Sequence, residues 1–233
     1  MNNLSVLVPF FNEEKTLFKS VSNLISANVS NEIILINDNS TDNSLKIAEE
    51  LVAKNECVEL INSDKNLGKG NAISLGLKKV NSDFVIVHDA DLEYNPIDIK
   101  KILESIPKMQ NTNTVVLGSR FIGDINRENI YLRTYLANKL FSFLFSLFNN
   151  FKVSDVATCY KLISRDIYKN IEIEKNGFDF EIEILHKALE HCKYYKEVPI
   201  SYSGRSYEDG KKIKLVDGFR YLKAILIDYN KRS

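Results

Sequence analysis

The sequence contains few of the residues that build disulfide-bonded, zinc-bound or loop-rich folds. Its 233 residues include no tryptophan, three cysteines, four prolines and nine glycines. The cysteines, Cys57, Cys159 and Cys192, are odd in number and far apart, and no Cys or His pair has the spacing of zinc ligands. These shortages argue against a structural zinc site and a loop-rich architecture, and they favour a reduced, cytoplasmic setting.

An excess of charge and long hydrophobic runs are also missing. The chain carries 31 basic and 31 acidic residues, so its net charge is zero. We therefore expect no nucleic-acid partner, because proteins held to nucleic acid by charge are normally basic. No stretch reaches the roughly 18 apolar residues that a membrane-spanning helix needs, and the N-terminus lacks the basic region of a signal peptide. With 44% hydrophobic and 27% charged residues, the composition is typical of a folded globular protein.

The first 120 residues alternate between short apolar runs and segments with helical periodicity. This alternation predicts βαβ units and a mostly parallel sheet whose two faces are covered by helices. The expected strands are Leu4–Phe10, Glu32–Asn37, Val58–Ile61, Asp83–His88 and Thr114–Gly118, and the expected helices are Lys15–Ala27, Ser44–Lys54, Lys69–Lys79 and a helix from Pro96 to about Met109.

After Arg120 the alternation gives way to a helical and strand elaboration. Its expected elements are a long helix at Tyr131–Asn149, a strand at Tyr160–Ser164, a helix at Phe180–His191, an edge strand at Tyr194–Tyr202 and a final helix at Lys214–Asn230. No linker composition separates the two parts, so we expect one domain that spans residues 1–233.

Polar side chains follow each of the first five strands. Ligands of open parallel sheets bind beyond the carboxyl ends of the strands, so these clusters predict one site. The sharpest is Asp89-Ala90-Asp91, whose two carboxylates can hold a hard cation such as Mg²⁺ or Mn²⁺ while substrate phosphates fill the other positions. Each cluster taken alone also has a purely structural explanation. Asp89–Asp91 could form a simple turn, and the loop at Gly68–Gly70 could be a plain helix start. The residues after Asp38 could cap a helix.

No single cluster identifies a protein family, but the clusters taken together resemble one. In order and spacing, PFFNEE (9–14), INDNSTDNS (36–44), NLGKGNA (66–72), DADLEYNP (89–96) and GSRF (118–121) resemble family 2 glycosyltransferases of the GT-A fold. Asp155–Lys161, Gly177–Ile184 and Glu197–Ile213 are similar to the dolichol-phosphate mannosyltransferase-like branch. The resemblance implies a GT-A (Rossmann-like) α/β fold, with a nucleotide-sugar-binding part at 1–120 and an acceptor-side part with amphipathic helices at 121–233.

The resemblance also implies roles for individual residues. Asp89 and Asp91 match the DxD motif that holds the metal against the donor diphosphate, and Glu93 stands where a third metal ligand is expected. Asn37 occupies a position where the family often has Asp, which bears on base contacts. The positions that match the donor site are Pro9, Phe10, Asn12, Glu13, Asp38, Ser40 and Lys69, and those that meet donor or acceptor phosphates are Arg120, Arg133, Arg205 and Lys211.

The need for a general base depends on the acceptor. A lipid phosphate is already anionic and requires no strong base, whereas a neutral hydroxyl must lose a proton to a carboxylate. The candidate bases are Asp155, Asp179 and Glu181; the last two open a helix, where acidic residues are also favoured by the helix dipole.

The predicted activity is inverting, metal-dependent transfer of a hexose from a GDP- or UDP-linked sugar to polyprenyl or dolichyl phosphate. Two alternatives stay open: the same fold acting on diacylglycerol or a growing glycan, and a nucleotide-sugar-binding protein without catalysis. A nucleotidyltransferase is a weaker option, because such enzymes usually have a glycine-rich, basic loop after the first strand, where this chain has PFFNEE. Because the helices at 131–149 and 214–230 are rich in apolar residues such as Phe141 and Phe145, we expect peripheral contact with the cytoplasmic face of a membrane. Packing of these helices on the protein, on a membrane-protein partner or on a second copy is the competing expectation.

Overall fold

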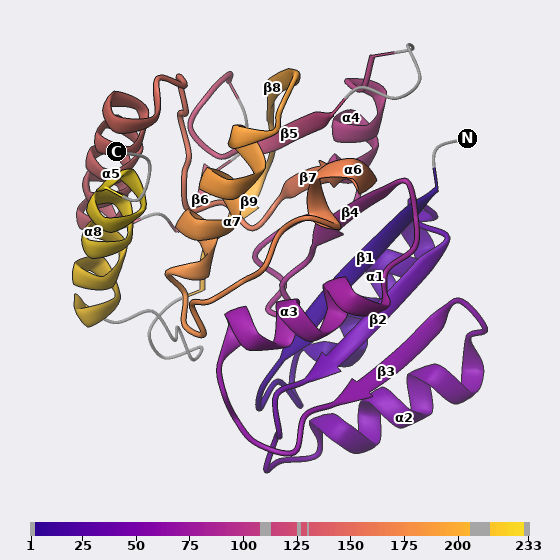
Figure 1. Ribbon diagram of the computed structural model, residues 1–233. Helices are drawn as coiled ribbons and strands as arrows, with labels where there is room; N and C mark the ends of the chain where they lie inside the picture. Colours follow the sequence, from indigo (N-terminus) through magenta and orange to yellow (C-terminus); the bar gives the residue numbers. More distant parts are fainter. Residues whose placement is uncertain (1–2, 108–112, 125–126, 130, 206–214, 231–233) are drawn as a thin grey trace.

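The computed structural model describes residues 3–107, 113–124, 127–129, 131–205 and 215–230. Seven strands form one mixed sheet in the order β3-β2-β1-β4-β7-β5-β8 (Figure 1). Neighbouring strands are parallel except for β7, which runs antiparallel between β4 and β5. The strands are β1 (Leu4–Phe10), β2 (Glu32–Asn37), β3 (Val58–Asn62), β4 (Phe84–Val87), β5 (Thr114–Ser119), β7 (Lys161–Ser164) and β8 (Tyr194–Pro199).

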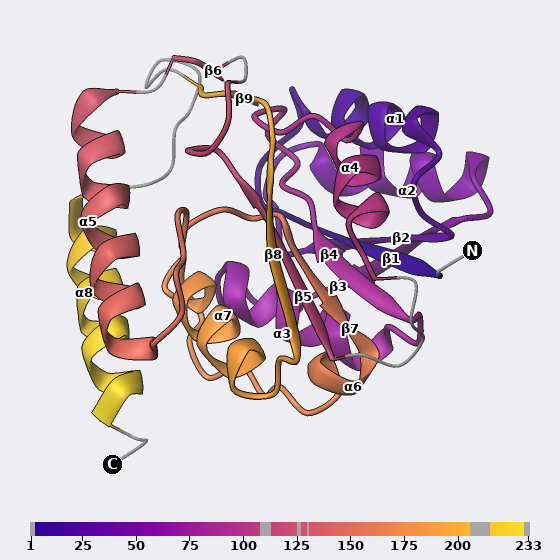
Figure 2. The same ribbon diagram turned by 90° about the horizontal axis from the view of Figure 1, so that it is seen from above.

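Helices cover both faces of the sheet, as the apolar strands predict. All seven residues of β1 are buried, and successive side chains enter different layers: Val6 and Val8 pack in one core and Leu7 in the other. The first core is closed by α1 (Leu17–Ala27), α2 (Ser44–Lys54) and α4 (Asp98–Glu104), and the second by α3 (Lys69–Lys79), α6 (Arg165–Tyr168) and α7 (Phe180–Glu190) (Figure 2). The mostly parallel, helix-flanked sheet expected from the sequence is confirmed.

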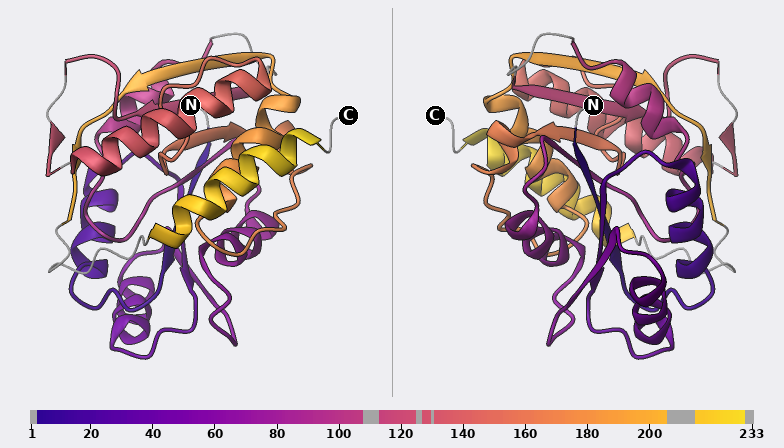
Figure 3. Two further views of the ribbon diagram at one scale, coloured as in Figure 1. Left: turned by 90° about the vertical axis from the view of Figure 1, so that its left-hand side faces the viewer. Right: turned by 90° about the vertical axis from the view of Figure 1, so that its right-hand side faces the viewer.

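Two further helices, α5 (Leu132–Asn149) and α8 (Leu215–Asn230), lie side by side on the flank of the second core (Figure 3). Their inner residues are held tightly: Phe145 is fully buried, and the ring of Phe141 meets that of Tyr221 edge to face with centroids 5.7 Å apart. The outer surface keeps an apolar stripe of Leu132, Leu136, Leu140, Phe143 and Leu147 on α5, with Phe219 and Leu226 on α8. Only part of the apolar surface predicted for these helices therefore reaches solvent. Among the described residues, no helix has the length and apolar character needed to cross a membrane.

The edge strand ends earlier than the sequence pattern predicts. β8 stops at Pro199, and the predicted segment divides, because the carboxylate of Asp98 accepts hydrogen bonds from both the backbone N–H and the hydroxyl of Ser201, at 2.8 and 2.5 Å. The chain then forms β9 (Tyr202–Ser203), which pairs with β6 (Arg127–Glu128). β6 and the short α6 were not expected, because their sequences show no clear periodicity. α4 ends at Glu104, before the expected end near Met109, which itself lies outside the described residues.

A buried ion pair joins β5 to the loop before β7. Arg120 donates from Nε and Nη2 to the two carboxylate oxygens of Asp155, at 2.7 and 2.8 Å, and its backbone N–H donates to the same group at 3.0 Å. The side chains are 9% and 0% exposed, and the guanidinium also lies over the rings of Tyr94 and Tyr202. A bidentate pair of this kind fixes the direction of Arg120 at the end of its strand.

Two glycine positions give a matched test of packing. A Cβ on Gly70 would lie 2.0 Å from the carbonyl oxygen of Lys175, whereas one on Gly218 would meet nothing nearer than 3.6 Å. Because the Gly70 contact is with backbone, we expect Gly70→Ala to lower the free energy of unfolding by about 1–3 kcal/mol. Gly218→Ala should instead raise it by roughly 0.5–1 kcal/mol through helix propensity. Urea unfolding measures both, and equal midpoints would contradict the close approach at Gly70.

The Arg120–Asp155 pair can be compared with an exposed one. We expect Asp155→Ala to destabilise the protein by about 3–5 kcal/mol, because it leaves a buried guanidinium without its partner. Glu59→Ala breaks the pair between Glu59 and Lys79, whose side chains are 44% and 48% exposed, respectively. This variant should lower the free energy of unfolding by less than about 1 kcal/mol. Similar unfolding midpoints for the two variants would show that the Arg120–Asp155 pair does not stabilise the fold.

Candidate functional site

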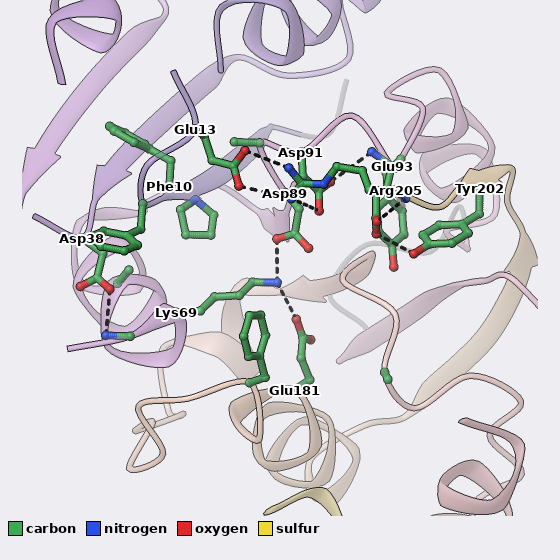
Figure 4. Close-up of a pocket in the computed structure, with 18 of the residues that line it drawn as sticks. Phe10, Glu13, Asp38, Lys69, Asp89, Asp91, Glu93, Glu181, Tyr202 and Arg205 are labelled. Atoms are coloured by element: carbon green, nitrogen blue, oxygen red, sulfur yellow. Dashed lines mark hydrogen bonds and ion pairs between the residues drawn. The ribbon is translucent and has the colours of Figure 1, made fainter. Parts of the chain in front are cut away.

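A cavity of about 280 Å³ lies beyond the carboxyl ends of β1, β2, β4 and β5 (Figure 4). Eleven of the residues singled out from the sequence line it together: Pro9, Phe10, Glu13, Asp38, Lys69, Asp89, Asp91, Glu93, Arg120, Glu181 and Arg205. Segments far apart in the chain thus meet at one edge of the sheet, as the parallel order predicts.

The loop after β4 presents two carboxylates to the cavity. Leu92 has φ 66°, and this turn lets Asp91 accept a hydrogen bond from the backbone N–H of Glu93 at 3.1 Å. Burial, together with the negative charges of Asp89 and Glu93, raises the pKa of Asp91 to about 7. Burial opposes the ionisation of Asp89 as well, but Lys69, with smaller contributions from His88 and Cys159, lowers the pKa of that carboxyl overall.

Asp89 and Asp91 suit a hard divalent cation. Mg²⁺ and similar ions bind carboxylate oxygens and take one or two from the protein when substrate phosphates supply the rest. A cation bound here would offset the negative charges of Asp89 and Glu93 that lie beside the buried Asp91. Glu93 is engaged elsewhere, because one of its oxygens accepts from the hydroxyl of Tyr202 at 2.5 Å and the other from the backbone N–H of Arg205 at 2.8 Å. Accordingly, no group of three or more His, Cys, Asp or Glu side chains in the described part of the chain is arranged around a metal position.

Lys69 is the cation nearest to Asp89. Its ammonium lies 2.6 Å from the Asp89 carboxylate and 3.0 Å from that of Glu181, and the second oxygen of Glu181 lies 2.5 Å from Lys161. Burial would lower the pKa of Lys69, but Asp89 and Glu181 raise it well above its usual value. Lys69 therefore stays charged, and Glu181 is a carboxylate held between two ammonium groups rather than a free base.

The glycine loop is fixed by the protein itself. Asp38 accepts from the backbone N–H of Leu67 and Gly68, at 2.9 and 2.8 Å, and Gly70 donates to the carbonyl of Asn176 at 2.8 Å. Gly68 has φ 100°, which explains the residue type. These backbone N–H groups are already hydrogen-bonded within the protein. The group that the loop presents to a ligand is therefore the side chain of Lys69.

Arg205 bridges two sides of the cavity. Its guanidinium reaches Glu13 at 3.1 Å and Asp91 at 3.3 Å, so it joins the loop after β1 to the loop after β4. Both carboxylates lose part of their mutual repulsion in this way.

Five residues expected at the site lie outside the cavity lining. Asn12 and Ser40 tie the loops after β1 and β2 together through the Asn12 N–H and the Ser40 hydroxyl, 3.1 Å apart. Asp155 is the buried partner of Arg120, and Arg133 is exposed on α5. Asp179 lines a separate cleft of about 470 Å³ with Lys175, Arg220 and Lys223. Lys211 lies outside the described residues.

Several lining residues were not predicted. Tyr94, Tyr202, Phe178 and Tyr221 form aromatic walls, and Lys161 supports the cavity from behind. Tyr202 and Lys161 lie within segments that were recognised as similar to the family. The sequence of such a segment does not show whether the side chain of a tyrosine or lysine points toward the cavity.

The charges of the lining explain what the cavity can hold. Six carboxylates and three cationic side chains face it within the described residues, a formal excess of three negative charges. A nucleoside diphosphate alone would be repelled by this excess, whereas a divalent cation with a diphosphate fits it.

Comparisons with known proteins agree with this geometry. Residues 5–172 match the family model described as Glycosyl transferase family 2. The Dolichol-phosphate mannosyltransferase of Pyrococcus furiosus is 28% identical over 89% of this chain, and the Dolichyl-phosphate beta-glucosyltransferase of Saccharomyces cerevisiae is 28% identical over 91%. The matches span 58% and 69% of those two proteins, so this chain covers little more than half of the first.

A solved structure shows the same fold. Glucosyl-3-phosphoglycerate synthase from Mycobacterium tuberculosis, in a complex with Mn²⁺, UDP-glucose and phosphoglyceric acid, superposes with a TM-score of 0.74 at 17% identity, over 98% of this chain and 80% of that one. The GT-A fold expected from the sequence is thereby confirmed. Since the family match takes in well over half of the residues, the chain belongs to glycosyl transferase family 2.

Proposed function

We propose that the protein transfers a hexose from a nucleotide-linked sugar to the phosphate of a membrane polyprenol, with a bound Mg²⁺ or Mn²⁺ and inversion at the sugar. Residues 1–120 supply most of the donor side of the cavity, and residues 121–233 the acceptor side. The family and the names of the curated relatives support the reaction class.

The observation that carries the choice of acceptor is the state of the carboxylates. Each of the six that line the described cavity already accepts from a cation or a hydrogen-bond donor: Glu13 from Arg205, Asp38 from two backbone N–H groups, Asp89 from Lys69, Asp91 from Arg205, Glu93 from Tyr202 and Glu181 from two lysines. The proposal assigns Asp91 to the metal, and the other five already serve the protein's own donors, which disfavours each of them as the base for a neutral hydroxyl. An acceptor that is already anionic, such as a lipid phosphate, needs no such base.

The reaction then requires charge balance more than proton transfer. An acceptor phosphate oxygen forms a bond to the anomeric carbon while the bond to the donor diphosphate breaks, and negative charge collects on the departing nucleoside diphosphate. A divalent cation held by Asp89 and Asp91 would neutralise that charge. Lys69 stays protonated beside the same position, and Arg120 points into the cavity with its direction fixed by Asp155. Its Nε and Nη2 are bonded to Asp155, so the other end of the guanidinium is the part that would meet an acceptor phosphate.

The flank formed by α5 and α8 is suited to a lipid surface. The apolar stripe on these helices adjoins the cleft that contains Lys175, Arg220 and Lys223, so apolar and basic groups occur together. Interfacial helices bind membranes through this combination. We infer peripheral binding to the cytoplasmic face of a membrane, where the phosphate of a lipid acceptor is exposed.

The test of function is a panel of UDP- and GDP-hexoses with Mg²⁺ or Mn²⁺, offered with three acceptors. Polyprenyl phosphate should be glycosylated, whereas polyprenol, which lacks only the phosphate, should not. Transfer to diacylglycerol or to polyprenol at a comparable rate would contradict the anionic acceptor, and donor binding without any transfer would favour a binding protein.

The DxD carboxylates provide the first prediction from this proposal. Asp89→Ala or Asp91→Ala removes a metal ligand, and losing several kcal/mol of charge stabilisation should lower kcat/KM by about a thousandfold or more. EDTA should likewise weaken binding of the nucleoside diphosphate. Calorimetry and a transfer assay measure both effects, with Asp64→Asn, an exposed carboxylate outside the cavity, as the control. Near-normal activity of either alanine variant at saturating Mn²⁺ would exclude the metal role.

A second prediction concerns the membrane. Leu140 and Phe143 are 54% and 63% exposed on α5, so replacing both with serine should leave the fold intact and weaken binding to anionic vesicles by about tenfold or more. Phe18 is 54% exposed on α1, at the other face of the sheet, and Phe18→Ser serves as the matched control. Sedimentation with vesicles at low and high salt measures binding, which should fall with salt. A monomeric wild-type protein that binds no vesicle would contradict the membrane role.

A further inference from the structure

Four charged side chains of alternating sign run from the interior to the cavity. They are Lys161 on β7, Glu181 on α7, Lys69 at the start of α3 and Asp89 after β4, joined by contacts of 2.5, 3.0 and 2.6 Å. Figure 4 shows the last two of these contacts, from Lys69 to Glu181 and to Asp89. The side chains of Lys161 and Glu181 are 2% and 4% exposed, and that of Lys69 is 13% exposed. Four separate elements therefore place one continuous chain of ion pairs behind the donor pocket.

We propose that Glu181 is a positioning residue that holds the ammonium of Lys69 against the diphosphate of the donor, and that Lys161 fixes Glu181 in turn. The inference rests on the proposed function in one respect, namely that the cavity takes a nucleoside diphosphate. It assigns Glu181 a role different from that of a general base.

Lys69 has the properties of the group that meets the ligand. It lines the cavity, and its ammonium lies between the carboxylates of Asp89 and Glu181. Its ammonium has three N–H donors; two face Asp89 and Glu181, and among the described residues the third has no further hydrogen-bond or ion-pair partner. The residue also begins α3, where the helix dipole favours an anion.

Glu181 limits where this ammonium can go. A lysine side chain is long and rotatable, so its charge is useful at one place only if something restrains it. The ring of Phe180 lies 5.4 Å below the ammonium, and Glu181 binds it from the side opposite Asp89. Lys161, which does not line the donor cavity, binds the other oxygen of Glu181 and donates to the backbone carbonyl of Thr158. The restraint is thereby anchored to the main chain.

A positioning role and a purely electrostatic role predict opposite results. Glu181→Gln removes one negative charge from an acidic cavity, so charge alone would make it bind a nucleoside diphosphate more tightly. If Glu181 positions Lys69, the same variant should bind more weakly, because the ammonium loses its restraint. Glu181→Asp keeps the charge but shortens the reach, and it should also weaken binding.

The experiment is calorimetry of UDP and GDP with the full chain, in Mn²⁺ and in EDTA. We expect Glu181→Gln to lower affinity roughly ten- to a hundredfold, the usual value of a hydrogen bond between charged groups, and Glu181→Asp about tenfold. Glu183→Gln is the control: Glu183 lies on the same helix and is equally buried, but it binds Lys187 and the backbone at 174 and 175. It should alter the melting temperature and leave nucleotide affinity unchanged.

A double-mutant cycle completes the test. If Glu181 acts through Lys69, Glu181→Gln should have no further effect on affinity in a Lys69→Met background. Additive losses, unchanged affinity of Glu181→Gln, or tighter binding by it would overturn the inference while leaving the proposed function intact. If Glu181→Gln does not fold, Glu181→Asp decides the question in the same cycle. A wild-type protein that binds neither nucleotide would overturn both proposals.

Discussion

Carboxylates gather at the carboxyl edge of the sheet, and burying charges of one sign together is costly unless each has a partner. Lys69, Arg205 and the backbone N–H groups of the glycine loop supply those partners in the described cavity. The pairing orders loops that come from distant parts of the chain. It also leaves an excess of negative charge in the pocket, so the proposed metal and the ordering of the loops have one electrostatic origin.

The same pairing separates carboxylates that look alike in the sequence. Asp155 pairs with Arg120, and Glu181 pairs with two lysines. Glu93 accepts hydrogen bonds from Tyr202 and from the backbone of Arg205. A carboxylate in this state is a ligand or a support rather than a base. This arrangement is compatible with the proposed phosphate acceptor, which is already anionic and needs no base.

The sequence predicted the sheet and the place of the site well because both depend on local patterns. Apolar runs identified the strands, and strand ends identified the loops that line the cavity. It could not separate Asp179 from Glu181. Residues 180–186 of α7 are buried all round, so no amphipathic pattern tells which side of the helix faces the cavity. The partners of buried charges were equally hidden, since long-range packing determines them.

The reversed direction of β7 has a consequence for how such a site can vary. A parallel strand reaches the ligand edge only where it ends, but β7 begins at that edge, with Lys161 paired to Leu117 near the end of β5. The connection from α5 into β7 therefore arrives at the pocket before the strand starts, and it brings Asp155 and Ala157 with it. Changes in this connection can reshape one wall of the pocket without altering any strand of the sheet, which under the proposed function would change the acceptor and leave the strand ends as they are.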